Sequence, residues 1–368
     1  MVLADYRPRH IEDFVGFDNE KAVLRQNLDY VSKIHAGALA QDQEDRRNGL
    51  ELQYHSVYVS APHVLIYGLP GSGKTTLGEL YAREMASLAK GLTQRNNGGR
   101  PVLDEWTNVG TPPTYGDMFR YVRLDASNIG NFETLDRYIL FAAPFAVILI
   151  DEIQNLKPEI LEKLLELMHD STWECALTGR RERRMCLTIV GTTTDQGKLS
   201  PAIRRRFETQ LELLEYSASD LDMIAEDAAR RAGMLLSPEG RLEVVDRGRG
   251  LPADIIRVIN SLHRRMTAAD HDDTEPIDAD DVAMAAGNIN FGPGGLEPAH
   301  VRLLSYLAAN GETSGRGLRD GCSLGTIDNL EALEVLLKLR GYIQMGTRGR
   351  SITPKGRGYL KDHKPSRS

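Results

Sequence analysis

Residues 68–75 have the sequence GLPGSGKT, which fits the GxxxxGK(S/T) pattern of a phosphate-binding loop. The loop follows an apolar run and opens a helical pattern over residues 75–85. Its backbone N–H groups would therefore converge on phosphate oxygens at a helix N-terminus. Lys74 would reach the terminal phosphates, and the Thr75 hydroxyl would coordinate Mg²⁺. A glycine-rich turn that binds no ligand is the alternative.

Two carboxylates, Asp151 and Glu152, directly follow the apolar run 146–150. Ligands bind at the carboxyl edge of a parallel sheet, and these side chains would lie at that edge. Asp151 could hold the Mg²⁺ shell, and Glu152 could accept a proton from an attacking water. Alone, the pair could equally be a strand that ends in solvent. The phosphate loop earlier in the chain favours the catalytic interpretation.

Hydroxyl residues and arginines follow the next apolar run, residues 187–190. A polar side chain within residues 191–194 could orient the water or sense the γ-phosphate. The segment 199–207 then carries three consecutive arginines behind a proline-initiated turn. Such a triplet is usually a solvated face. In an oligomeric ATPase, however, an arginine at this place reaches the γ-phosphate of the neighbouring subunit.

The composition limits the class of protein. The chain has 368 residues (40.9 kDa), with 45 Lys and Arg against 52 Asp and Glu, so its net charge of -7 excludes a coat-like basic protein. Its 3 cysteines form neither a disulfide framework nor a CxxC pair. The opening residues lack the apolar core of a signal peptide, and the longest apolar run, 145–150, is too short to span a bilayer. We therefore expect a cytoplasmic protein without membrane association.

The elements that must position these residues alternate between strand and helix. Helical patterns separate four apolar runs that we expect to be buried strands: 63–67, 121–124, 146–150 and 187–190. This order favours an α/β fold with a parallel sheet. Strand signals stop after Phe207, and amphipathic patterns over 221–231 and 255–266 predict an all-helical lid. The polar segment 36–60 is interpreted as an insertion or loop.

The C-terminal segment has the pattern of a winged helix. Helical patterns over 300–309 and 326–340 precede two short runs, 342–344 and 351–353, that could pair as a hairpin. An unspecified small α+β tail is the alternative. With residues 292–295 interpreted as a hinge, we predict three domains: an α/β ATPase core (1–215), a helical lid (216–292) and a winged helix (293–368).

Positive charge gathers in this last segment. Between Gly341 and Ser368 lie seven Lys or Arg residues against one acidic residue, Asp362. Such charge on a wing gives DNA affinity without sequence specificity, because it contacts phosphates. A solvated terminus is the alternative. The residues that we expect to contact DNA are Arg348, Arg350, Lys355 and Arg357.

In this order the motifs resemble those of the AAA+ ATPases, and nearly the whole chain is similar to the RuvB family of Holliday-junction branch-migration motors. The similarity lies in Arg7-Pro8, residues 13–16, 63–76, 150–154 and 191–194, Arg206 before Phe207, Tyr216, and residues 295–296, 302–304, 341–342, 348–350 and 353–354. It implies an AAA+ core with a parallel sheet, followed by an all-helical lid and a winged-helix domain.

The resemblance also implies roles for single residues. The catalytic residues would be Lys74, Asp151, Glu152, Thr194 as sensor 1, and Arg206 as the arginine finger. The ATP-binding residues would be Arg7, Pro8, Val15, Gly71, Ser72, Gly73, Lys74, Thr75, Thr76, Tyr216 and Pro252. Thr75 and Asp151 would hold Mg²⁺.

As a function, the resemblance implies a homo-oligomeric ring, expected to be a hexamer. With ATP and Mg²⁺ it would translocate double-stranded DNA or branch-migrate Holliday junctions. An ATP-dependent switch, loader or initiator that acts on DNA with little translocation is the alternative. A protein-remodelling AAA+ protein or scaffold without a DNA role is a third hypothesis.

Four features depart from the family pattern. Ala253 occupies the place of the sensor 2 arginine, and Arg257, one helical turn on, could substitute for it. The hairpin 173–185 is short and basic, which disfavours a RuvA-like junction-binding partner; its arginines could contact DNA, a protein or only solvent. Met345 replaces a DNA-contacting arginine of the wing. The insertion 36–60 is atypical, so we expect a specialised relative of the branch-migration motor.

Overall fold

The structure, a computed structural model, describes residues 8–48, 61–96, 102–107, 111–113, 118–183, 186–272 and 274–363. These residues form two compact units, one within Arg7–Glu215 and one within Tyr216–Ser368. Of the residues discussed above, Arg7, 49–60, Arg184, Met185 and the end of the basic tail, 364–368, lie outside the described ranges. Within those ranges, no helix is both long and apolar enough to cross a membrane.

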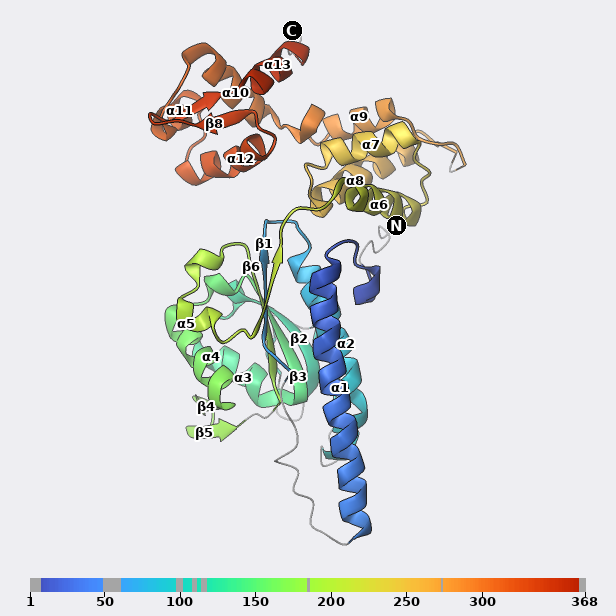
Figure 1. Cartoon of the computed structure of the whole chain (residues 1–368), viewed down its shortest axis with the longest axis vertical. Coiled ribbons are helices and arrows are strands. Elements are labelled where there is room, and N and C mark those ends of the chain that lie inside the picture. Colours follow the sequence, from blue (N-terminus) through green and yellow to red (C-terminus); the bar gives the residue numbers. More distant parts are fainter. Residues whose placement is uncertain are drawn as a thin grey trace. The chain divides into compact units, whose positions relative to one another are not determined.

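A five-stranded parallel sheet organises the first unit (Figure 1). In the order β2-β3-β6-β1-β7, its strands are β2 (Phe119–Asp125), β3 (Ala142–Asp151), β6 (Thr188–Thr193), β1 (Val64–Gly68) and β7 (Thr209–Leu213). The four predicted strands all lie in this sheet. The expectation that strands stop after Phe207 is wrong. Strand β7 forms an edge and alternates buried with exposed residues, so it has no continuous apolar run.

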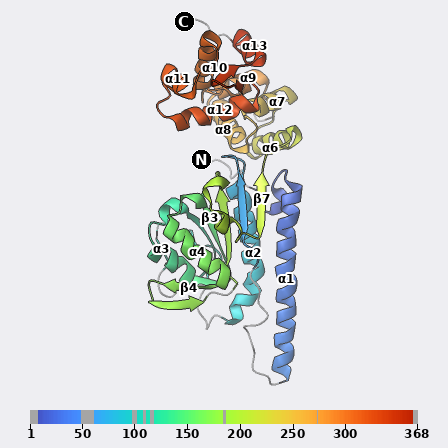
Figure 2. The ribbon, with the colours of Figure 1, turned by 60° about the vertical axis from the view of Figure 1, so that its left-hand side comes forward.

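Helices cover both faces of this sheet (Figures 1 and 2). One face packs on α1 (Asp18–Arg47) and α2 (Lys74–Asn96), the other on α3 (Phe132–Phe141), α4 (Pro158–Asp170) and α5 (Pro201–Arg204). Successive residues of β3 alternate between the two cores, so that Leu149 faces α2 and Ile150 faces α4. Because both faces are buried, the central strands are continuous apolar runs, which made them recognisable in the sequence.

Helix α1 corrects one interpretation. Residues 36–47, part of the segment interpreted as an insertion or loop, continue this 30-residue helix. They are polar but rich in Ala, Gln, Glu and Arg, which favour a helix without requiring an apolar face. The loop alternative is therefore wrong for residues 36–47. That the segment is inserted relative to the family remains a prediction.

A hairpin of β4 (Thr172–Cys175) and β5 (Arg180–Arg183) precedes β6. Its base is anchored by Asp136 of α3, a fully buried carboxylate that accepts a hydrogen bond of 3.0 Å from Trp173 Nε1. Arg181 is exposed and bonds to a glutamate of α4 at 3.0 Å. The three alternatives for its arginines, contact with DNA, with a protein or only with solvent, all stay predictions.

Four helices open the second unit: α6 (Ala218–Arg231), α7 (Pro238–Arg247), α8 (Pro252–Ala268) and α9 (Ala279–Gly287). Ser217, Ser237 and Asp278 cap α6, α7 and α9, because their side-chain oxygens accept hydrogen bonds from backbone N–H groups of the first turn. The four helices share one apolar core. This arrangement confirms the predicted all-helical segment.

Helices and a hairpin follow: α10 (Pro298–Asn310), α11 (Gly315–Gly321), α12 (Ile327–Leu339), β8 (Ile343–Met345), β9 (Arg350–Ile352) and α13 (Pro354–Asp362). Thr313 adds an isolated antiparallel β-bridge to the hairpin, since its N–H and carbonyl bond to the backbone of Arg350 at 2.9 and 2.8 Å. Three helices followed by this small sheet confirm the predicted winged helix.

The junction between the helical segment and the winged helix is bonded on both sides. Gly294 N donates to Asp246 Oδ2 of α7 at 2.6 Å. From the other side, Tyr359 of α13 donates its hydroxyl proton to the carbonyl oxygen of Pro293 at 3.1 Å. Elements of both segments thus bond to this short stretch, and its interpretation as a hinge stays a prediction.

Candidate functional site

Residues 69–73 form the loop between β1 and α2, at the carboxyl end of a central strand. Gly71 and Gly73 have φ angles of 80° and 94°, in the left-handed region that favours glycine. At Gly68, a Cβ atom would lie 2.3 Å from the carbonyl oxygen of Leu213 on β7. The three glycines of the motif are thus required by the backbone conformation and by the close approach of β7.

Lys74 begins α2 and is buried beneath this loop. Its Nζ donates a hydrogen bond to the carbonyl oxygen of Leu69 at 2.8 Å. Burial lowers the pKa of Lys74, although the carboxylates of Glu152 and Asp151 oppose the shift. Lys74 therefore interacts with the loop through a hydrogen bond and with both carboxylates through their charges.

Thr75 and Asp151 meet between α2 and the end of β3. Thr75 Oγ1 donates to Asp151 Oδ1 at 2.7 Å, and Thr192 Oγ1 of β6 donates to the same oxygen at 2.5 Å. Burial would raise the pKa of Asp151, but hydrogen bonds from Thr192 and Thr75 and the nearby Arg123 guanidinium hold it below its usual value. A hydroxyl and a carboxylate, both hard oxygen donors, are a ligand set that suits Mg²⁺ completed by substrate phosphates.

Glu152 adopts a left-handed backbone conformation, with φ 52° and ψ 50°. This conformation is uncommon for a residue other than glycine and concentrates at functional sites. Its Oε2 accepts hydrogen bonds from Thr194 Oγ1 at 2.8 Å and from Gln154 Nε2 at 2.5 Å. The carboxylate predicted as the base and the hydroxyl predicted as the sensor are thus in direct contact.

Two residues of this cluster were missed by sequence reasoning. Arg123 of β2 donates to Asp151 Oδ2 at 2.7 Å and to Glu79 Oε1 of α2 at 2.6 Å. Neither Arg123 nor Glu79 belongs to a motif. A signal was nevertheless present, because an arginine inside the apolar run 121–124 requires an acidic partner once the strand is buried.

The comparisons with known proteins agree with this geometry. Residues 64–214 match the ATPase family associated with various cellular activities (AAA). The RuvB Holliday junction branch migration motor of Thermotoga maritima is similar in structure, with a TM-score of 0.66 and 24% identity over 98% of this chain and 99% of that one. A mutant of the same RuvB gives a TM-score of 0.68 and 23% identity over the same shares. Residues 64–214 therefore form an AAA ATPase domain, and the chain as a whole has a RuvB-like fold.

The predicted fold class is therefore confirmed: an AAA+ core with a parallel sheet, a helical segment and a winged helix. The cluster of Lys74, Thr75, Asp151, Glu152 and Thr194 lies wholly within the segment that matches the AAA family. At these levels of identity, the likeness to RuvB concerns the fold.

Other predicted site residues lie outside this cluster. Pro8 and Val15 flank a short 3-10 helix near the start of the described chain, and Arg206 follows α5 with its side chain half-buried. Tyr216 and Pro252 belong to the second unit. Burial raises the pKa of Tyr216 above its usual value. The nucleotide contacts of these residues remain predictions.

Arg257, the predicted substitute for a sensor 2 arginine, is engaged within its own unit. Its Nη1 bonds to Asp254 Oδ1 at 3.1 Å, and its guanidinium lies 4.5 Å from the ring centre of Phe291. Arg249 bonds to the other oxygen of Asp254 at 2.8 Å and contacts the same ring at 4.4 Å. Ala253 precedes this cluster on α8 and carries no polar group.

Arg350, a predicted DNA contact, is turned into the winged helix. Its Nε donates to Glu334 Oε1 at 2.6 Å, and Glu334 is fully buried. Arg348, Lys355 and Arg357 are exposed, and the Nη1 of Arg357 lies 3.3 Å from a carbonyl oxygen of α10. The four DNA contacts remain predictions, but Arg350 already has a structural partner.

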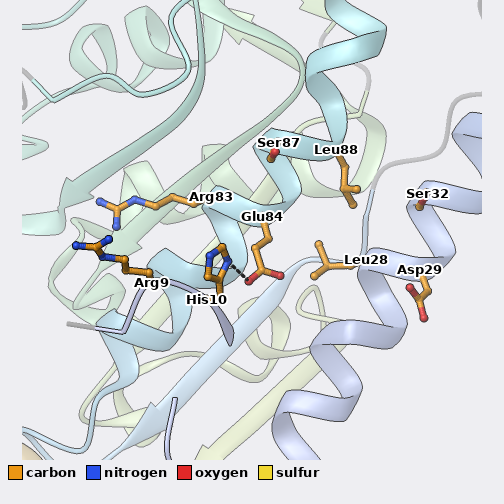
Figure 3. A pocket seen from close by; sticks show the side chains of 9 residues that line it. All are labelled: Arg9, His10, Leu28, Asp29, Ser32, Arg83, Glu84, Ser87 and Leu88. Carbon is orange, nitrogen blue, oxygen red and sulfur yellow. Dashed lines mark ion pairs between the residues drawn. The ribbon is translucent and has the colours of Figure 1, made fainter. Parts of the chain in front are cut away.

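A separate pocket of about 410 Å³ lies between the N-terminal segment, α1 and α2 (Figure 3). Its lining includes Arg9, His10 and Arg83 on one side and Leu28 and Leu88 on the other. None of the predicted phosphate-site residues lines it. The catalytic interpretation therefore rests on the open loop at the sheet edge and not on this cavity.

Proposed function

We propose that the protein hydrolyses ATP with Mg²⁺ at the cluster of Lys74, Thr75, Asp151 and Glu152. The contact of 2.7 Å between Thr75 Oγ1 and Asp151 Oδ1 carries this proposal. It joins the last residue of the phosphate loop to a strand-end carboxylate, beside the buried Lys74. The match of residues 64–214 to the AAA family supports the same conclusion.

In this proposal each side chain has one task. Lys74 and the backbone N–H groups of residues 71–76 bind the phosphates, and Thr75 and Asp151 hold Mg²⁺. When bound, the metal ion neutralises phosphate charge. Glu152 accepts the proton of the attacking water, and Thr194 orients its carboxylate. Arg206 acts on the nucleotide of a neighbouring subunit in a homo-oligomeric ring, which we propose to be a hexamer.

We propose further that Arg7, Pro8, Val15, Tyr216 and Pro252 bind the nucleoside part of ATP. We also propose three domains: the α/β ATPase core (1–215), the helical lid (216–292) and the winged helix (293–368). The resemblance of the sequence to the RuvB family supports these assignments.

We propose double-stranded or branched DNA as the partner, moved through ATP-driven translocation or branch migration. The similar protein from Thermotoga maritima is named a Holliday junction branch migration motor. The exposed Arg348, Lys355 and Arg357 of the winged helix supply positive charge for phosphate contacts.

The test is the steady-state ATPase rate with and without duplex DNA, for the unsubstituted protein and for Glu152→Gln. Loss of the proton acceptor should lower the rate about 100-fold or more, while nucleotide binding persists. A Glu152→Gln protein with full activity would exclude the catalytic assignment. An Asp195→Asn variant, altered at the exposed carboxylate that follows Thr194, is the control and should retain the rate.

A switch or loader with little translocation is the second candidate, and Ala253 favours it. The start of α8 carries no arginine at the position where the resemblance expects the sensor 2 residue. A junction-unwinding assay separates the two functions. ATP-dependent strand separation supports the motor, whereas ATP-dependent DNA binding without separation supports the switch.

A further inference from the structure

Arg123 places a positive charge beside the carboxylate that the proposed metal site requires. Strands β2 and β3 are parallel neighbours, with Arg123 opposite Leu149. Asp151 is two residues further along β3, so its side chain emerges on the same face as that of Arg123. Helix α2 covers this face and brings Glu79 to the guanidinium.

The guanidinium of Arg123 joins two carboxylates that are removed from solvent. Nη1 lies 2.6 Å from Glu79 and Nη2 lies 2.7 Å from Asp151. The acidic side chains are only 6% and 12% exposed, whereas Arg123 is 38% exposed. In such surroundings a paired guanidinium offsets much of the cost of burying the carboxylates.

The two oxygens of Asp151 are occupied by different partners. Oδ1 accepts hydrogen bonds from Thr75 and Thr192, and Oδ2 accepts the bond from Arg123. A divalent cation that engages this carboxylate therefore meets a positive charge already bonded to one of its oxygens. When a cation binds Asp151, the Arg123 guanidinium can keep its ion pair with Glu79.

We infer that Arg123 is a positioning residue that serves as the internal counter-cation of Asp151 and competes with Mg²⁺ for it, with Glu79 as its second anchor. The inference rests on the proposed Mg²⁺–nucleotide site. Arg123 thereby sets the Mg²⁺ concentration at which the site takes up metal and nucleotide together. Without metal, the same contact keeps the buried carboxylates neutralised.

The test measures binding of N-methylanthraniloyl-ADP by fluorescence at graded free Mg²⁺ in the full-length protein. Arg123→Gln removes the competing charge, so the half-saturating Mg²⁺ concentration should fall about three- to ten-fold. Glu79→Gln removes the second anchor and one negative charge, so the same quantity should rise by a similar factor, about three- to ten-fold. A purely structural role would not move the two variants in opposite directions.

Arg120→Gln is the matched control. Arg120 lies on the same strand, is buried, pairs with Asp104 at 2.7 Å and donates to the carbonyl oxygen of Val102 at 3.3 Å. The half-saturating Mg²⁺ concentration of Arg120→Gln should equal that of the unsubstituted protein. An unchanged or raised value in Arg123→Gln would overturn the inference. If that variant does not fold, as judged by circular dichroism, an unchanged or lowered value in Glu79→Gln overturns it.

The same titration distinguishes failure of the inference from failure of the proposed function. If the unsubstituted protein binds the nucleotide with no dependence on Mg²⁺, the proposed metal site is wrong, and the inference about Arg123 is overturned as well. If binding depends on Mg²⁺ but neither substitution moves the half-saturation, only the role of Arg123 is overturned.

Discussion

At the phosphate site and in the wing, an arginine meets a carboxylate at nearly the same distance. Arg123 is 38% exposed and bonds to Asp151 at 2.7 Å, whereas Arg350 is 17% exposed and bonds at 2.6 Å to Glu334, which is fully buried. The first pair borders the loop that we propose binds phosphate. The second pair ties β9 to α12. The same kind of ion pair thus occurs beside a proposed ligand site and inside a domain core, and the two differ in what surrounds the carboxylate.

The largest expected effect is on the stability of the wing. Arg350→Ala leaves the buried Glu334 with Lys338 as its remaining charged partner, at 2.8 Å. We expect the free energy of unfolding to fall by roughly 3 kcal/mol, the cost of breaking a buried ion pair. Urea unfolding of the full chain measures this free energy. The control is Arg348→Ala, at an exposed neighbouring position, which should change the free energy of unfolding by about 0.5 kcal/mol or less. Equal effects of the two substitutions would contradict a fastening role for Arg350.

The second expected effect is a pH dependence of the free energy of unfolding, caused by one buried histidine in each unit. Burial lowers the pKa of His63 in the first unit and of His300 in the second from 6.5 to about 4. Each folded unit therefore excludes a proton that the unfolded chain binds. The stability is fully present above pH 6.5 and is lost as the pH falls from 6.5 to about 4, at most about 3 kcal/mol for each histidine.

Asparagine substitutions test this pH dependence. The Nδ1 atoms of His63 and His300 accept backbone hydrogen bonds at 3.0 and 3.1 Å, and an asparagine oxygen can accept in their place without titrating. In His63→Asn and His300→Asn, the free energy of unfolding should vary less between pH 6.5 and 4 than in the unsubstituted protein. An unchanged slope in either variant contradicts the assignment for that unit.

The smallest effect concerns DNA affinity. Replacing Arg348, Lys355 and Arg357 together by Gln should reduce the slope of log affinity against log salt by about one for each DNA phosphate that the protein no longer neutralises. The control is Glu334→Met with Arg350→Met, which removes the internal pair as a unit and keeps an apolar contact. Its slope should equal that of the unsubstituted protein. A reduced slope in the control would return Arg350 to the DNA-binding surface.

The arrangement of residues at the proposed phosphate site was predictable because the backbone fixes their positions. Gly71 and Gly73 require positive φ angles, Lys74 and Thr75 begin the following helix, and Asp151 ends a buried strand. Motif spacing therefore determines where these side chains meet. Charge counting in the wing was a weaker guide, because a count does not distinguish the inward Arg350 from its exposed neighbours.

Elements without an apolar run or a motif were missed for a related reason. Strand β7 alternates polar and apolar residues at a sheet edge, and the last turns of α1 are polar helix formers. The pairing of Arg123 with Glu79 and Asp151 joins three elements far apart in the chain. Local patterns cannot show such a contact until the topology of the sheet is known.

The bonded junction at residues 292–295 decides how the protein should be divided for experiments. Asp246 holds Gly294 from the helical segment, and Tyr359 holds Pro293 from the winged helix. A fragment that begins at residue 293 would lose the first of these bonds and expose the face that α7 covers. Residues 216–368 form a better separate reagent than the winged helix alone, and a protease should find its preferred cut elsewhere than between these two segments.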